Sequence, residues 1–181
     1  MKKKLPLLAA LAVAAVALGV VTVHAAGPGP AYLHVSSFRA DLENGNSAKL
    51  TVTTGVRIPR QPDSFINANP VVGFAWVDLD TGKVFVAVIH PVLGRDSHQD
   101  PESWHAHTAS LAGGASAPND FCVASIDSTP TAGIEIHRDT MNVNVRSDQL
   151  PFPTDAVDAA VGFTIQPDAA CSSGLAVRTI A

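Results

Sequence analysis

Short runs of β-favouring residues recur along this chain, and turn-forming residues separate them. The runs are rich in Val, Ile, Thr, Phe and Trp, whose side chains favour pleated, half-buried backbone. Pairs such as Asn44 with Gly45 and Gly113 with Gly114 interrupt them. After the N-terminal segment, no stretch of useful length has the apolar spacing of a helix. The expected strands span residues 32–37, 48–56, 71–78, 83–90, 104–111, 121–126, 133–138, 141–146, 159–166 and 175–180.

About ten short strands at this spacing predict an all-β fold, and we expect an antiparallel β-sandwich of the immunoglobulin-like or Greek-key type. The clearest local prediction is a hairpin between residues 71–78 and 83–90, in which Gly82 supplies the positive φ of the turn. The second of these strands is apolar on both faces, which is typical of a central strand covered on both sides. Pro91 lacks an N–H for the ladder, so this strand should end at His90.

The N-terminal segment predicts export. Lysines occupy residues 2–4, an apolar run follows, and Val23 and Ala25 are the small or apolar residues that a signal-peptidase site requires. We expect residues 1–25 to be a signal peptide that is cleaved after Ala25, and residues 26–181 to form a single secreted domain, periplasmic or extracellular. The alternative is an uncleaved N-terminal anchor, because an apolar run of about nineteen residues is just long enough to span a bilayer.

The charge of the chain argues against two classes of partner. The sequence has 16 acidic and 12 basic residues, and three of the basic ones lie in the N-terminal segment. No basic stripe is left that could neutralise phosphates, so we expect neither a nucleic acid nor an anionic membrane surface as partner. The oligomeric state and the identity of any other partner do not follow from the sequence.

Two cysteines, Cys122 and Cys171, are the whole thiol content of the chain. In an exported protein, an even pair most simply forms a disulfide. The bond would close a loop of about fifty residues and contribute up to about 4 kcal/mol through chain entropy. The alternatives are two free thiols or a cysteine that binds a metal, although neither residue stands in a Cys-x-x-Cys spacing.

Histidines and carboxylates concentrate in one segment of the chain. The segment holds four of the seven histidines together with three carboxylates: His90, Asp96, His98, Asp100, Glu102, His105 and His107. Side chains alternate along a strand, so His105 and His107 should share one face with Ala109 and Leu111. We expect His90 at the end of a neighbouring strand, where its imidazole would be close enough to His105 and His107 to bind the same metal ion.

This arrangement predicts a transition-metal site. Imidazole nitrogens bind zinc and copper well, and such a site needs three or four ligands that converge about 2.0–2.2 Å from the metal. We expect His90, His105 and His107 to be ligands, with His98 or Asp96 as the fourth. Ligation requires neutral imidazoles, so metal affinity should fall on acidification.

Asp100 and Glu102 have a different expected role, as acceptors that orient an imidazole from behind. The alternative interpretation of the whole segment is that no metal binds. Residues 96–103 would then be a solvated polar loop, and His90 would end its strand through a backbone hydrogen bond. A His-x-His pair also occurs by chance on many strands.

The expected function is binding without catalysis. We expect an exported binding or cell-surface accessory domain, with the metal site at one end. The first alternative is a secreted copper- or zinc-binding metalloprotein, and the second is a secreted hydrolase whose site the sequence does not reveal. No Gly-x-Ser-x-Gly elbow, phosphate-binding glycine loop or dinucleotide fingerprint occurs in the chain.

Overall fold

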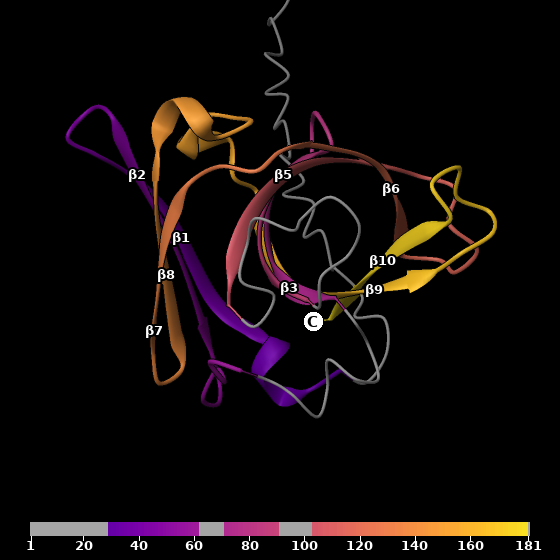
Figure 1. Ribbon diagram of the computed structural model, residues 1–181, viewed down its shortest axis with the longest axis horizontal. Helices are drawn as coiled ribbons and strands as arrows, with labels where there is room; N and C mark the ends of the chain where they lie inside the picture. Colours follow the sequence, from indigo (N-terminus) through magenta and orange to yellow (C-terminus); the bar gives the residue numbers. More distant parts are fainter. Residues whose placement is uncertain (1–28, 62–70, 91–102, 181) are drawn as a thin grey trace, which may run out of the picture.

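The described part of the chain forms ten strands in two antiparallel sheets (Figure 1). This computed structural model describes residues 29–61, 71–90 and 103–180. The strands are β1 (Val35–Glu43), β2 (Ser47–Thr54), β3 (Val72–Asp78), β4 (Lys83–Ile89), β5 (His105–Ala112), β6 (Asp120–Ser128), β7 (Ala132–His137), β8 (Thr140–Arg146), β9 (Ala159–Pro167) and β10 (Leu175–Ile180). Within these ranges the chain also makes the short 3₁₀ turns η1 (Ala31–Leu33), η2 (Ser147–Gln149) and η3 (Thr154–Ala156).

The larger sheet closes into a barrel in the order β10-β6-β5-β4-β3-β9, and the smaller sheet has the order β1-β2-β8-β7. Figure 1 looks into the barrel, with the smaller sheet standing beside it. The predicted all-β class is confirmed. The predicted immunoglobulin-like sandwich is not confirmed, because β9 pairs with both β3 and β10 while β10 also pairs with β6. Strands of a sandwich and of a barrel share the same alternation, so the pattern alone does not separate them.

The observed strands lie where the sequence predicts them, with ends that differ by several residues in places. The first expected strand, at residues 32–37, shows a large difference. Ala31–Leu33 instead forms a 3₁₀ turn, and β1 begins at Val35. The predicted hairpin is present as β3 and β4, and Gly82 has the expected positive φ, at 67°.

Strand β4 is buried on both faces, as the sequence predicts. Phe85 and Ile89 face outward from the barrel, into the core shared with the smaller sheet. Val84, Val86 and Val88 face the barrel interior, where they join a second apolar cluster. The strand therefore serves as the wall between two cores, which fixes both its position and the direction of every side chain on it.

The core between the barrel and the smaller sheet holds large buried side chains. Trp76 and Phe85 of the barrel wall meet edge to face, with ring centroids 6.2 Å apart. Strands β2 and β8 of the smaller sheet cover this wall with buried side chains: Ala48, Leu50, Val52, Met141, Val143 and Val145. Burying one of the larger side chains stabilises a fold by about 1.5–3 kcal/mol. This core therefore holds the β3–β4 wall firmly in place.

The barrel closes at a short seam, where β6 and β10 pair through only three residues of each strand. The predicted disulfide between Cys122 and Cys171 is confirmed, and it ties β6 to the loop between β9 and β10. In the same loop, Asp168 accepts hydrogen bonds from the hydroxyl and N–H of Ser116 and from the N–H of Ala170. These donors, with the Ser116 hydroxyl first, hold the pKa of the Asp168 carboxyl below its usual value.

Within the described ranges, no helix is long and apolar enough to cross a membrane. The expected signal peptide, residues 1–25, lies outside those ranges, so cleavage and export remain predictions.

The close packing of Gly162 in β9 gives a first prediction. A Cβ at this position would overlap the backbone carbonyl of Leu33, so we expect Gly162→Ala to lower the free energy of unfolding by about 1–3 kcal/mol, as overpacking does. Gly133→Ala in β7 is the matched control, because its new methyl group would meet only the Asn144 carbonyl, at 4.0 Å. Urea unfolding measures both variants. Equal effects of the two substitutions would contradict this account of Gly162.

The short seam gives a second prediction. We expect reduction of the Cys122–Cys171 bond to destabilise the protein by up to about 4 kcal/mol and to loosen β10 before the rest of the barrel. Hydrogen exchange of the amides from Leu175 to Ile180, with and without reductant, measures the local effect. If these amides exchange no faster than those of β4 after reduction, the seam does not depend on the disulfide.

Candidate metal centre

Three histidines meet at one end of the barrel because of the register between β4 and β5. His105 lies opposite Val88, and His107 lies opposite Val86. Both valines belong to the apolar cluster inside the barrel. His90 follows Val88 by two residues, so it continues the inward face of β4 just past the end of the strand. The alternation predicted from the sequence therefore places all three imidazoles on the inner side of the same wall.

The three rings are close together and buried. The ring centroids of His90 and His105 are 4.6 Å apart, those of His105 and His107 are 5.0 Å apart, and those of His90 and His107 are 6.1 Å apart. One nitrogen from each ring lies within 4.8 Å of the other two. The residues are only 5%, 7% and 5% exposed in the order of their numbers. The prediction that His90 joins the His-x-His pair is confirmed.

Hydrogen bonds at Nδ1 hold two of these rings. His105 Nδ1 lies 3.0 Å from the carbonyl oxygen of Ser103, and His107 Nδ1 lies 3.1 Å from the hydroxyl oxygen of Thr129. A carbonyl oxygen only accepts, so the His105 Nδ1 carries the hydrogen, and the Nε2 of the neutral ring directs its lone pair toward His90. Contacts of this kind at the remote nitrogen are typical of metal-binding histidines, whose orientation they fix.

The spacing of the nitrogens suits a single metal ion. His90 Nε2 and His105 Nε2 are 2.9 Å apart. Two nitrogens bound to one zinc at about 2.0–2.1 Å lie about 3 Å apart, the separation depending on the angle at the metal. The ligand nitrogens of all three rings lie within 4.8 Å of one another. Three histidines within this reach can therefore bind one zinc or copper ion.

The group consists of histidines alone, among the residues that the structure describes. Neutral imidazoles bring no negative charge to a metal ion. A divalent ion held by His90, His105 and His107 would keep its full double charge inside a mostly apolar end of the barrel. A divalent ion at these rings would therefore favour an anion as a further ligand.

The structure leaves four of the predicted site residues untested, because they lie outside the described residues: Asp96, His98, Asp100 and Glu102. Their roles as ligands or as orienting groups stay predictions. Sequence reasoning missed Ser103 and Thr129, which orient two of the rings. Ser103 acts through its backbone carbonyl, which no side-chain pattern reveals. Thr129 lies 22 residues beyond His107 and reaches it only through the pairing of β5 with β6.

The inside of the barrel leaves a cavity of about 400 Å³, which the sequence does not predict. His90 and His107 form part of its wall. Ala109 and Leu111 line it as well, on the strand face that alternation assigns to them together with His107. Two members of the histidine group therefore contact an apolar chamber inside the barrel.

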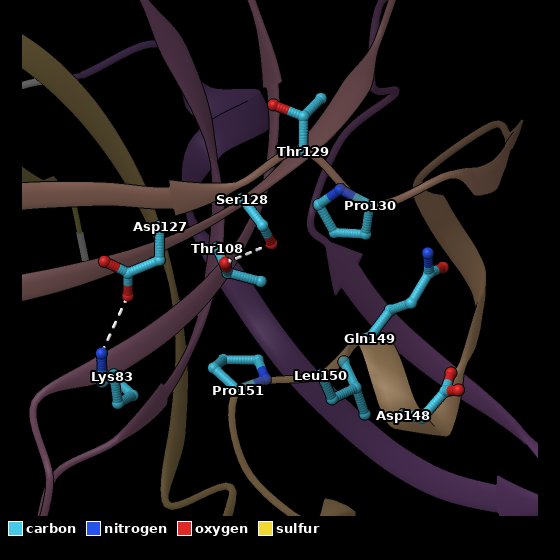
Figure 2. Close-up of a pocket in the computed structure, with 10 residues that line it drawn as sticks. All are labelled: Lys83, Thr108, Asp127, Ser128, Thr129, Pro130, Asp148, Gln149, Leu150 and Pro151. Carbon is cyan, nitrogen blue, oxygen red and sulfur yellow. Dashed lines mark hydrogen bonds and ion pairs between the residues drawn. The ribbon is translucent and has the colours of Figure 1, made fainter.

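A second hollow, of about 480 Å³, lies between the outer wall of the barrel and the segment that follows β8 (Figure 2). Figure 2 shows Lys83 and Asp127 facing one another, and their charged atoms are 2.8 Å apart. The Lys83 ammonium, with the Ser125 hydroxyl, lowers the pKa of Asp127 to about 2. Asp148 pairs with Arg146 at the other side. These charges satisfy one another, so the hollow is a weaker candidate site than the histidines.

The ion pair in this hollow gives a third prediction. The folded-state pKa of Asp127 is lowered from 3.8 to about 2, so its stabilising effect is present above about pH 4 and is lost as the pH falls toward about 2. Both side chains are partly exposed, at 40% for Lys83 and 30% for Asp127, so Asp127→Asn should cost at most about 1 kcal/mol. Urea unfolding near neutral pH and near pH 2 measures the difference from wild type. A difference that is the same at both pH values would contradict the assignment.

Comparisons of this chain with protein-family models, with curated proteins and with solved structures found no match. The chemistry of His90, His105 and His107 is therefore inferred from their own geometry, in which three buried imidazoles at the end of a closed barrel lie close enough to bind one metal ion.

Proposed function

We propose that this protein is a secreted metalloprotein whose His90, His105 and His107 bind one zinc or copper ion. The convergence of three buried imidazoles carries the proposal. It favours the metalloprotein over the accessory binding domain that the sequence alone favours. Export is part of the proposal and is supported by the signal-like N-terminal sequence, residues 1–25.

Imidazoles are a costlier choice than apolar side chains for buried inward positions, because polar groups must be desolvated. Positive charges on adjacent buried imidazoles would also repel one another. Valine occupies the preceding inward positions of β4, at Val84, Val86 and Val88, and would complete the apolar lining at lower cost. A metal ion offers what valine cannot, because it accepts the lone pairs of all three rings at once.

If neither Asp96 nor His98 completes the coordination, the number of ligands favours a reactive or exchangeable centre over a purely structural one. Structural zinc sites are closed by four protein ligands, whereas sites that bind or transform a further molecule keep one position for it. The described residues supply three ligands. The fourth position would then hold water or another small molecule, which agrees with the chamber that His90 and His107 line.

Calorimetric titration with Zn²⁺ and Cu²⁺ tests the proposal. We expect one ion per chain, and His105→Ala or His107→Ala should weaken binding by more than about 100-fold, since even the groups behind a ligand contribute about 10–100-fold. Thr129→Val keeps the shape of the side chain but removes the hydrogen bond to His107, so it should weaken binding by about tenfold. His137→Ala is the control, because that histidine is exposed on β7 and should not affect binding.

Two results would contradict the proposal. The first is an absence of binding by the wild-type protein at micromolar metal, and the second is equal binding by the wild type and the His105→Ala, His107→Ala double variant. The metal affinities of the variants Asp96→Ala and His98→Ala test the identity of the fourth ligand. If neither changes the affinity, the fourth position is not filled by the residues that the sequence predicts for it.

A further inference from the structure

The chamber next to the histidines is apolar through most of its wall. Valines from β4, at 84, 86 and 88, form one side, while Phe163 of β9 and Val177 of β10 belong to the opposite side. Apart from the two histidines, the described residues of the wall include no acidic or basic side chain. A cavity of about 400 Å³ lies at the lower end of the range of about 300–1,000 Å³ that small-molecule sites occupy.

The chamber also has an apolar rim. Ile126 of β6 and Leu175 of β10 both line the cavity and are 59% and 41% exposed. They lie where β6 and β10 are no longer paired, because the seam between these strands covers only residues 120–122 and 176–178. Exposed apolar side chains at the opening of an apolar cavity favour the entry of an apolar molecule.

We propose that the barrel binds a carboxylate with a medium-length hydrocarbon chain. The chain would lie in the chamber, and the carboxylate group would bind the metal ion held by His90, His105 and His107. This inference rests on the proposed function, because the metal ion supplies the partner of the carboxylate. Both ends of the ligand follow from the site: the apolar wall selects the chain, and the metal centre selects the head group.

The charge of the centre argues for an anion in particular. Three neutral imidazoles leave a divalent ion with its double positive charge, and the described wall offers no acidic side chain to offset it. A carboxylate oxygen is a good ligand for zinc, at about 2.0–2.2 Å. An alcohol with the same chain would fill the chamber equally well but would leave the charge in place.

Calorimetry with octanoate and 1-octanol tests both ends of the ligand. We expect octanoate to bind the zinc-loaded protein at least tenfold more tightly than the protein treated with a chelator, whereas 1-octanol should bind the two forms alike. Affinity should rise by about fourfold for each methylene from hexanoate to octanoate, and should stop rising once the chamber is full. Replacing zinc by Co²⁺ adds a direct readout, because octanoate should change the visible spectrum of the bound cobalt.

A substitution that fills the chamber gives the matched structural test. Ala75 lies in β3, lines the cavity and is 4% exposed, so Ala75→Phe should abolish octanoate binding while zinc binding persists. Ala124→Phe introduces the same side chain at an exposed position of β6 and should change neither. If Ala75→Phe fails to fold, Val177→Phe replaces it on the opposite side of the chamber.

The outcomes separate the two proposals. Zinc binding without octanoate binding would overturn the carboxylate inference and leave the metalloprotein intact. Equal affinity of octanoate for the zinc-loaded and metal-free forms would overturn the contact between carboxylate and metal. An absence of both zinc and copper binding would overturn the proposed function itself, and octanoate binding to that metal-free protein would not rescue the inference.

Discussion

The burial of strand β4 on both faces is the constraint on which the rest of the structure depends. Its outward side chains, such as Phe85, pack against the smaller sheet, and its inward valines pack inside the barrel. A slip of one residue would exchange the two sets, so both cores resist it together. The strand therefore delivers His90 to the inner side of the barrel end, and the paired strand β5 delivers His105 and His107 beside it. A metal centre needs side chains held within fractions of an ångström, and a strand locked between two cores provides that rigidity.

The histidines make the end of the barrel chemically different from its middle. Along the inward face of β4 the side chains are valines until His90 takes the next position, so an apolar chamber ends in three imidazole rings. Ser103 and Thr129 hold two of the rings from behind. Beyond the short seam between β6 and β10, the exposed side chains of Ile126 and Leu175 line the chamber, and the Cys122–Cys171 bond ties β6 to the loop before β10. A site that binds a further molecule requires rigid histidine side chains and a route by which that molecule reaches the chamber.

Local pattern was enough to predict the parts of this structure that depend on nearby residues. The hairpin of β3 and β4, the shared face of His105 and His107, and the strand end at His90 all follow from alternation, Gly82 and Pro91. The closure of the barrel did not follow, because it depends on β9 pairing with both β3 and β10, and such long-range pairings leave no mark in the alternation. The chamber was missed for a related reason, since an unfilled volume is a property of the closed barrel and not of any strand.

The crystal structure of the protein soaked with zinc, with anomalous diffraction data, tests the central claim most directly. The account predicts a single strong anomalous peak between His90, His105 and His107, about 2.0–2.1 Å from one nitrogen of each ring. Density for a water or an anion should complete the coordination on the side of the chamber. The account would be contradicted if neither a zinc soak nor a copper soak placed a metal at these three rings, or if the metal bound at other residues while the hydrogen bond between His90 and His105 persisted.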